Sequence, residues 1–205
     1  MPFYIVKIGG SLMGCAREIM RQLEMLTSEG YTFLIIPGGG PMADLIRYIH
    51  HWHSISEEAA HWMALLAMEQ YAYFLADATI ARLVDEISMP ESGIEVLLPY
   101  QALLKDDDWI LHSWNYTSDS VAAKAACRLK TDFVKATDVD GIIQNGDLVP
   151  EVTAAGLIGQ KTCVDQGTLS ILNRCKQNCI VMRGSDPMRF ATDLKKRRGG
   201  TLIKG

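Results

Sequence analysis

The sequence predicts an α/β protein with an open, mostly parallel sheet and helices on both of its faces. Short β-type runs alternate with helical patterns along the whole chain of 205 residues, which is the arrangement of consecutive βα units. The run Tyr31–Ile36 is continuously apolar, as expected of a strand that is buried on both faces of a parallel sheet. Because no linker or low-complexity segment interrupts this pattern, we expect one domain over residues 1–205.

The first half contains predicted strands and helices in alternation. In chain order these are a strand at 4–8, a helix at 15–29, a strand at 31–36, a helix from Pro41, a long alanine-rich helix at 56–86, and strands at 94–98 and 109–111. The helix at 15–29 has apolar residues at helical spacing, and Gly30 is placed to end it. Pro41 suits the first turn of a helix, and Ser56 is a candidate N-cap.

The second half continues in the same way. Its predicted elements are a helix at 118–130, a strand at 133–136, a helix at 168–178, a strand at 179–182, a helix at 186–198 and a last edge strand at 201–204. The first of these helices opens with Thr117, Ser118 and Asp119, residue types that satisfy free N–H groups at a helix start. These residues predict a cap, and capping alone is a sufficient reason for them.

Composition and charge indicate a cytoplasmic globular protein. The net charge is −4 and the pI is near 5.7, which argues against a nucleic-acid or anionic-membrane surface. Apolar stretches are short, and we expect neither a membrane span nor a signal peptide. The five cysteines are an odd number without a C-x-x-C pair, a pattern that suits free thiols in a reducing cytoplasm better than a disulfide scaffold.

Two glycine clusters follow predicted strands at the edge where parallel sheets bind ligands. They are Gly9 and Gly10 after the first strand, and Gly38, Gly39 and Gly40 after the second. Without side chains, successive backbone N–H groups can converge on an anion, so two such loops are suited to several phosphate groups. Lys7, just before the first turn, is placed to supply the positive charge that phosphoryl transfer needs.

Two other interpretations of these glycines stay open at this point. The glycines can serve only to make tight turns between strand and helix. The spacing Gly38-x-Gly40-x-x-Ala43 also matches a dinucleotide-binding fingerprint, although Glu57 and Glu58, near the required distance, lie inside a helical pattern. The chain has no G-x-x-x-x-G-K-[ST] motif.

Two further segments carry polar side chains of uncertain role. Thr137-Asp138-Val139-Asp140-Gly141 follows a strand, where its aspartates either stabilise a turn or contact a nucleotide or its Mg²⁺. Histidines cluster at His50, His51 and His53, with His61 beyond, but no compact set of four ligands is present. We therefore expect no protein-held metal site.

Four motifs in order, IVKIGGS, IIPGGGPMA, TSDSVAAKAA and KATDVDGI, resemble the amino acid kinase superfamily, which includes acetylglutamate, aspartate, uridylate and isopentenyl phosphate kinases. The resemblance runs from residue 4 to the C-terminus. It implies a three-layer αβα sandwich, with the acceptor over about residues 1–110 and the nucleotide over about 111–205. It also implies ATP and Mg²⁺, a small phosphorylated substrate, and a homodimer or larger homo-oligomer.

The resemblance assigns roles to residues at matching positions. Lys7 matches the lysine that stabilises the transferring phosphoryl group, and Asp119 the aspartate that orients it. The nucleotide and its phosphates are assigned to Gly9, Gly10, Gly38, Gly39, Gly40, Thr137, Asp138, Asp140 and Gly141. The acceptor is assigned to Gly39, Gly40, His61 and Ser118. For His61, near the start of the long helix, a packing role is the alternative.

One departure bears on the acceptor. Acetylglutamate kinases have a second catalytic lysine near the start of the helix that follows Thr162, and Lys161 does not clearly take its place. The Val164-Asp165 step is more similar to uridylate kinases, which favours a phosphate as the acceptor.

Within the family, the short length, Leu97-Leu98-Pro99 and His112-Ser113-Trp114 resemble the short archaeal-type kinases of methanofuran biosynthesis. That resemblance implies conversion of [5-(aminomethyl)furan-3-yl]methyl phosphate to its diphosphate. The alternatives are another activity of the family, a non-catalytic nucleotide-binding module, or a nicotinamide-binding oxidoreductase.

Overall fold

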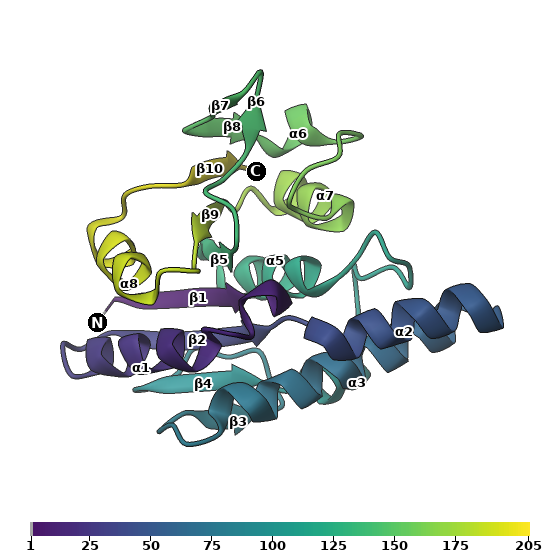
Figure 1. Ribbon diagram of the computed structural model, residues 1–205, viewed down its shortest axis with the longest axis horizontal. Helices are drawn as coiled ribbons and strands as arrows, with labels where there is room; N and C mark the ends of the chain where they lie inside the picture. The colour runs from purple at the N-terminus through teal and green to yellow at the C-terminus, as the bar shows by residue number, and fades with distance from the viewer. Residues whose placement is uncertain (1) are drawn as a thin grey trace.

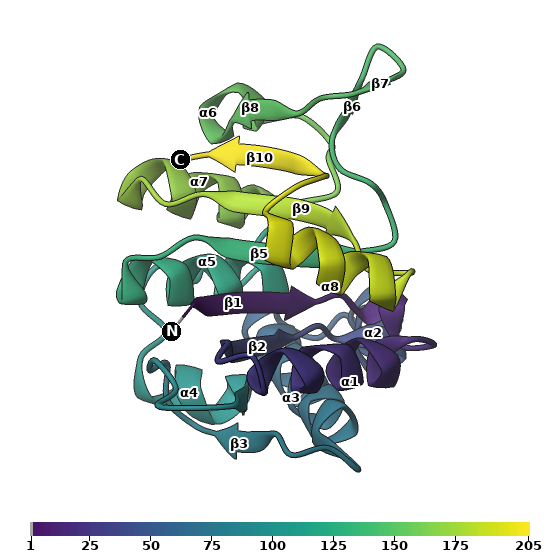
Figure 2. The same cartoon turned by 90° about the vertical axis from the view of Figure 1, so that its left-hand side faces the viewer.

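An eight-stranded sheet forms the centre of the computed structural model, which describes residues 2–205 (Figures 1 and 2). Its strand order is β3-β4-β2-β1-β5-β9-β10-β8, and all neighbours are parallel except β9 and β10. The strands are β1 (Phe3–Ile8), β2 (Thr32–Pro37), β3 (Arg82–Val84), β4 (Ile94–Leu97), β5 (Phe133–Thr137), β8 (Glu151–Thr153), β9 (Cys179–Arg183) and β10 (Thr201–Lys204). A separate hairpin pairs β6 (Ile143–Gln144) with β7 (Asp147–Leu148).

Helices cover both faces of this sheet. They are the 3₁₀ turn η1 (Gly10–Leu12), α1 (Ala16–Thr27), α2 (Gly40–His53), α3 (Glu57–Ala76), α4 (Pro99–Lys105), α5 (Ser118–Leu129), α6 (Ala154–Leu157), α7 (Gln166–Cys175) and α8 (Pro187–Lys196). One face packs against α1 and α8, the other against α5 and α7, and α3 contributes to the hydrophobic cores of both (Figure 2). This arrangement confirms the predicted three-layer αβα fold. No helix among the described residues is long and apolar enough to cross a membrane.

The central strand β1 shows how alternation places a charged residue in the core. Ile5 belongs to the hydrophobic cluster on the α5 side, whereas Val6 and Ile8 belong to the cluster on the α1 side. Side chains of a strand alternate between faces, so Lys7 points to the same side as Ile5, toward α5. In the neighbouring strand, Lys135 is the register partner of Lys7 and shares that face.

The prediction of a long helix at 56–86 is wrong for its last third. Its N-cap is Ser56, as expected, and Oγ of Ser56 accepts from the N–H of Ala59. The helix ends at Ala76, whose carbonyl accepts from the hydroxyl of Thr79 at 2.9 Å. The following residues form β3, because pairing with β4 gives Arg82–Val84 backbone partners that an exposed helical turn lacks.

Other predicted boundaries also need correction. Residues 109–111 are not a strand: Trp109 has a positive φ of 72°, and the preceding carbonyl of Asp108 is bound by Lys124. The strand at 201–204 is present, but it lies inside the sheet between β9 and β8 instead of at the edge. The edge strand β8, the helix α4 and the β6–β7 hairpin were not predicted, since each is only two to seven residues long.

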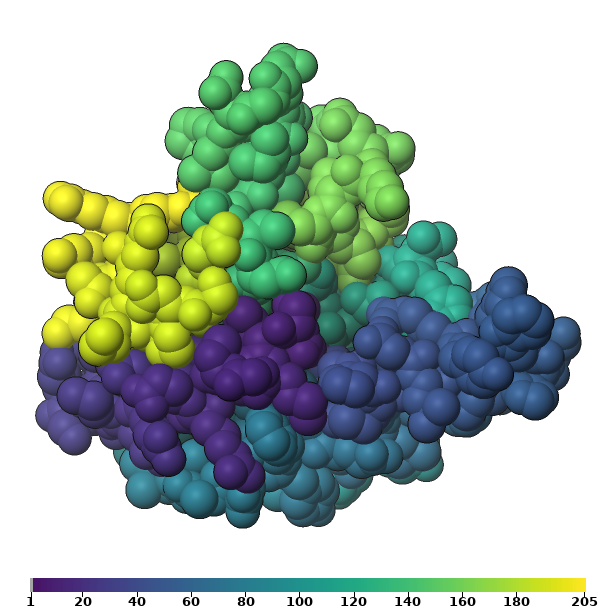
Figure 3. Space-filling view, viewed as in Figure 1, coloured from purple at the N-terminus to yellow at the C-terminus, as the bar shows by residue number. Residues whose placement is uncertain are grey.

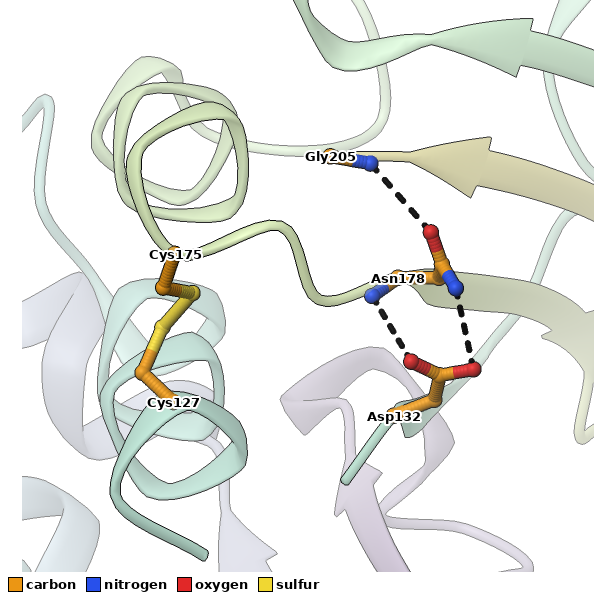
Figure 4. Close-up of a disulfide and its surroundings, with 5 residues drawn as sticks. All are labelled: Cys127, Asp132, Cys175, Asn178 and Gly205. Carbon is orange, nitrogen blue, oxygen red and sulfur yellow. Dashed lines mark hydrogen bonds between the residues drawn. A yellow bond between two sulfur atoms is a disulfide. The ribbon is translucent and has the colours of Figure 1, made fainter. Parts of the chain in front are cut away.

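A disulfide joins Cys127, near the end of α5, to Cys175, the last residue of α7 (Figure 4). Beside it, the side chain of Asp132 accepts two hydrogen bonds from Asn178, and Oδ1 of Asn178 accepts from the N–H of Gly205. The expectation of free thiols is therefore wrong for this pair, because the fold brings together cysteines 48 residues apart in the chain. The remaining cysteines, Cys15, Cys163 and Cys179, are free.

Candidate active site

The two glycine loops pack directly against each other at the carboxyl ends of β1 and β2. A Cβ on Gly10 would lie 2.3 Å from the backbone nitrogen of Gly40, and one on Gly38 would lie 2.6 Å from that of Gly10. The N–H of Gly38 also donates to the carbonyl of Ile8 at 2.9 Å. Close backbone approach is thus one reason for these glycines, so the simple packing interpretation explains part of the motif.

A groove of about 390 Å³ runs past both loops and the start of α5. It lies where Figure 3 shows a recess between the purple N-terminal segment and the blue α2. Its lining residues are Lys7, Gly9, Gly10, Ser11, Gly39, Gly40, Pro41, Ala43, Asp44, Arg47, Thr117, Ser118 and Thr137. The fold therefore brings together most of the residues predicted to form the phosphate and acceptor sites. Gly38, Asp138, Asp140 and Gly141 do not line this groove.

Two buried lysines share one buried aspartate beside the groove. The Nζ of Lys7 lies 2.9 Å from Oδ1 of Asp119, without hydrogen-bond alignment. Lys135 donates both to Oδ2 of Asp119 and to the carbonyl oxygen of Cys163. All three ionisable side chains are at least nine-tenths buried, so they form a fixed cluster.

Lys135 was missed by sequence reasoning, and it supplies a second ammonium group near Asp119. It is the first residue of the KATDVDGI motif, in which only Thr137, Asp138, Asp140 and Gly141 were assigned a role. A usable signal was present: a lysine inside the otherwise apolar run Phe133–Ala136 of a predicted central strand. Lys161, the nearest candidate in sequence, is exposed.

The lysines and burial together set the ionisation of this cluster. Burial is the strongest influence on Asp119 and favours the neutral acid, but Lys135 and Lys7 together outweigh it and lower its pKa to about 2. Burial lowers the pKa of Lys7, an effect that Asp119 only partly opposes. Burial also opposes charge on Lys135, but the attraction and hydrogen bond of Asp119 exceed it and raise its pKa. Asp119 is therefore ionised at neutral pH, and Lys135 remains charged.

Asp165 fixes the start of α5 against α7. Its Oδ1 caps α7 by accepting from the N–H of Thr168 at 2.7 Å. Its Oδ2 accepts from the N–H and hydroxyl of Thr117, at 2.9 and 2.6 Å, and Oδ1 accepts from the hydroxyl of Ser120. The hydroxyls that the sequence placed at this helix start thus bind another element instead of their own helix, and they hold Asp119 in position.

A second, smaller cavity of about 70 Å³ adjoins the groove, with Arg47 and Ser118 lining both. Its walls come from α2, α3, the segment before α5 and the start of α5 itself: Gly39, Ala43, Arg47, Glu57, Ala60, His61, Ala64, Leu65, Met68, Ile110, Ser113, Trp114, Tyr116, Thr117, Ser118 and Val121. The predicted acceptor residues Gly39, His61 and Ser118 meet here, whereas Arg47, Trp114 and Tyr116 were not predicted. We call this space the acceptor cavity.

His61 is neutral at physiological pH. Burial, with a smaller contribution from the nearby His112, lowers its pKa to about 4. The two rings stack with centroids 4.0 Å apart, and His112 is bracketed by Glu58 and Asp107, which raise its pKa. The Nε2 atom of His61 is buried and has no hydrogen-bond partner among the described residues.

The loop after β5 has a structural reason of its own. Asp140 forms two hydrogen bonds with the guanidinium of Arg183, at 2.8 and 2.9 Å. A Cβ on Gly141 would lie 2.3 Å from Oγ1 of Thr201, which accepts from the N–H of Ile142. These contacts stabilise the loop, and the nucleotide contacts assigned to Thr137, Asp138, Asp140 and Gly141 remain predictions.

The histidines of the first half contact aromatic rings and carboxylates. His50 accepts from Nε1 of Trp114 and faces Glu57, while His61 stacks on His112. No group of three His, Cys, Asp or Glu side chains suited to a metal ion occurs within residues 2–205.

Comparisons with known proteins identify a matching sequence profile and a similar enzyme. A sequence profile described as the amino acid kinase family matches residues 2–97. The [5-(aminomethyl)furan-3-yl]methyl phosphate kinase of Methanocaldococcus jannaschii is 35% identical over 198 residues, which cover 91% of this chain and 90% of that protein.

Solved structures of uridylate kinases share the fold. The enzyme from Archaeoglobus fulgidus has a TM-score of 0.72 at 20% identity, over 99% of this chain and 100% of that one. The enzyme from Ureaplasma parvum has a TM-score of 0.74 at 14% identity, over 100% and 99%.

Proposed function

Because the chain belongs to the amino acid kinase family, we propose that it is an ATP-dependent kinase that converts a small phosphate monoester to a diphosphate. The acceptor that we propose is [5-(aminomethyl)furan-3-yl]methyl phosphate, which is in the name of the 35% identical relative. The observation that carries the proposal is the pair of lysines on Asp119 beside a glycine-walled groove. Phosphoryl transfer needs fixed positive charge and N–H donors more than a covalent catalyst.

In the proposed reaction, an oxygen of the acceptor phosphate attacks the γ-phosphorus of ATP. A new P–O bond forms while the bond to the β,γ-bridging oxygen breaks, and ADP leaves with that oxygen. Lys7 lines the groove and its Nζ is not aligned as a donor to Asp119, so its N–H groups are free to contact the transferring phosphoryl group. Lys135 adds a second fixed positive charge, and Asp119 positions both.

No general base is required in this scheme. A phosphate monoester has a second pKa near 6, so its oxygens are already ionised and nucleophilic at neutral pH. His61, neutral with a pKa of about 4, is suited to hydrogen bonding with the acceptor.

Backbone amides of both glycine loops are the proposed ligands of the nucleotide and acceptor phosphates. Mg²⁺, when bound, neutralises phosphate charge. The carboxylate of Asp119 contacts two lysines, and residues 2–205 contain no group of three His, Cys, Asp or Glu side chains suited to a metal ion. Both observations fit a Mg²⁺ that is held largely by substrate phosphates and water.

The size of the acceptor cavity supports a small acceptor. Its volume of about 70 Å³ is well below the ~300–1,000 Å³ of sites for drug-sized ligands. A five-membered ring suits this space better than a nucleoside, which favours the furan phosphate over UMP.

ADP formation with a panel of acceptors tests the proposal. The panel contains the aminomethylfuran phosphate, UMP, isopentenyl phosphate, acetylglutamate and aspartate, each with ATP and Mg²⁺. We expect turnover with the furan phosphate. Turnover with a carboxylate acceptor alone would exclude a phosphate acceptor.

Substitution of Lys7 tests the mechanism. We expect Lys7→Ala to abolish turnover while nucleotide binding, measured by calorimetry, is largely kept. The exposed Lys161→Ala is the matched control and keeps wild-type turnover. ADP formation that depends on the acceptor also excludes a non-catalytic nucleotide-binding module.

Assembly and location remain proposals. We propose a homo-oligomer, supported by the exposed apolar side chains Leu66 and Tyr73 on α3, with light scattering as its test. We also propose a cytoplasmic location. The Cys127–Cys175 disulfide removes one argument for it, the expectation of free thiols, although intracellular proteins of hyperthermophiles do contain disulfides.

A further inference from the structure

One hydrogen bond and one charge contact place a half-exposed carboxylate in the wall of the acceptor cavity. Nε1 of Trp114 donates to Nδ1 of His50 at 3.1 Å, and Nε2 of His50 lies 3.3 Å from Oε1 of Glu57. An indole N–H only donates, so Nδ1 of His50 accepts and the proton of the neutral imidazole is on Nε2, facing the carboxylate. Trp114, His50 and Glu57 come from three separate segments, so the tertiary fold sets the position of this carboxylate.

The cavity also has a defined polarity. Arg47 lines both the groove and the cavity, whereas Glu57 lines only the cavity. The guanidinium of Arg47 lies over the ring of Trp114, 4.9 Å from its centroid, which restrains it at this junction. Nη1 of Arg47 also lies 2.6 Å from Oδ1 of Asp44, a groove residue, so Arg47 gives this junction N–H donors that one carboxylate already pairs. Glu57 is the carboxylate that lines the cavity but not the groove. The complementary ligand has a phosphate toward the groove and a cation at the other end.

The interior of the cavity contains a buried polar atom that a ligand could bind. The His61 side chain is only 7% exposed and lines the cavity, yet its Nε2 has no hydrogen-bond partner among the described residues. Buried polar atoms are rarely left unpaired in native proteins. The neighbouring walls include Ala60, Ala64 and Leu65, so a flat, largely apolar group with one polar atom fits between the two charged ends.

We propose that Glu57 determines acceptor specificity by binding the ammonium group of an acceptor that carries an amine and a phosphate on one small ring. His50 and Trp114 act as positioning residues for its carboxylate. This role rests on the kinase function proposed above and names the chemical class of its substrate. A primary alkylamine has a pKa near 10, so it is cationic at neutral pH. UMP and isopentenyl phosphate lack such a cation and leave Glu57 unpaired.

Two acceptors and two neighbouring variants test this role. The acceptors are the aminomethylfuran phosphate and (furan-3-yl)methyl phosphate, which has the same ring and phosphate without the amine. The variants are Glu57→Gln and the matched control Glu58→Gln. Glu58 is the next residue on α3, but it binds Trp62 and His112 and does not line the cavity.

For Glu57→Gln we expect KM for the amine-bearing acceptor to rise about tenfold or more, the scale of a hydrogen bond to a charged group. KM for the amine-free acceptor and for ATP should stay within about twofold, and Glu58→Gln should leave the preference for the amine unchanged. Trp114→Phe keeps the ring under Arg47 but removes the N–H, and should weaken the same preference by a smaller factor. Thermal unfolding of each variant verifies that it is folded.

The possible failures are distinguishable. If wild-type protein turns over neither furan acceptor, the proposed acceptor is wrong and the role of Glu57 is overturned with it. If wild-type protein turns over the amine-bearing acceptor but Glu57→Gln keeps its KM, the kinase function stands and Glu57 is not the specificity residue. An equal rise in KM for both acceptors also overturns the proposal, because it indicates altered cavity shape instead of lost ammonium binding.

Discussion

Replacing Asp119 by Asn is the most direct test of the buried charge cluster. The substitution keeps the size of the side chain but removes the negative charge shared by Lys7 and Lys135. Two buried ammonium groups then face each other without a counter-ion. Removing one partner of a buried ion pair costs about 3–5 kcal/mol, and we expect a loss of this size at pH 7.

The pH dependence of this loss follows from the pKa of Asp119, which is about 2 in the folded protein and ordinarily 3.8. At about 1.4 kcal/mol per pKa unit, this difference corresponds to about 2 kcal/mol of stability. Because the folded-state pKa is the lower one, this contribution is fully present above about pH 4 and is lost as the pH falls toward 2. Asparagine does not titrate, so the stability difference between wild type and variant should shrink by about 2 kcal/mol over that range.

Urea unfolding followed by tryptophan fluorescence, at pH values between 2 and 7, measures both quantities. The difference between the two proteins cancels the titration of carboxylates that they have in common. A variant as stable as wild type at pH 7, or a stability difference that does not change with pH, would refute the assignment of Asp119 as a buried ionised counter-ion.

Three further predictions concern other parts of the molecule. Lys135→Met should lower kcat about 10²-fold or more while calorimetry shows nucleotide binding largely kept, since a fixed charge near the transferring group is lost; unchanged kcat would exclude this role. Reducing the Cys127–Cys175 disulfide should lower the free energy of unfolding by about 4 kcal/mol, from a sequence separation of 48 residues. Equal urea midpoints with and without reductant, after mass spectrometry shows complete reduction, would contradict that value. Gly10→Ala should abolish turnover, because its Cβ would lie 2.3 Å from the nitrogen of Gly40 and force the loops apart; wild-type kcat would show that the loops adapt.

The sheet and most of its helices could be predicted because their signals are local. The apolar run of β2 and the glycines at strand ends follow directly from what a parallel sheet requires. The boundary at Ala76 could not be predicted in this way. Residues 77–86 are compatible with a helix, and only the backbone partners supplied by β4 make Arg82–Val84 a strand.

The candidate site was predicted where a motif marked it and missed where tertiary contacts create it. Lys7 and Asp119 were predicted to act together, and Nζ of Lys7 lies 2.9 Å from Oδ1 of Asp119. Lys135 was overlooked because a single lysine in a short strand does not reveal which face it occupies or what it meets there. Arg47 and Trp114 gain their position from contacts between α2 and a distant segment, so no spacing in the sequence indicates them.

The register pairing of Lys7 with Lys135 separates the chemistry of this protein from its choice of acceptor. Their backbones are adjacent strands about 4.8 Å apart, a spacing that insertions in surrounding loops leave unchanged. The acceptor cavity is instead built mainly by α2, α3 and an irregular segment, with Ser118 and Val121 of α5 beside them. The side chains of α2 and α3 can be exchanged without moving the sheet. Evolution, or a protein engineer, can therefore change which molecule is phosphorylated by altering the helical wall alone. The two central strands then retain the two lysines that we propose act in phosphoryl transfer.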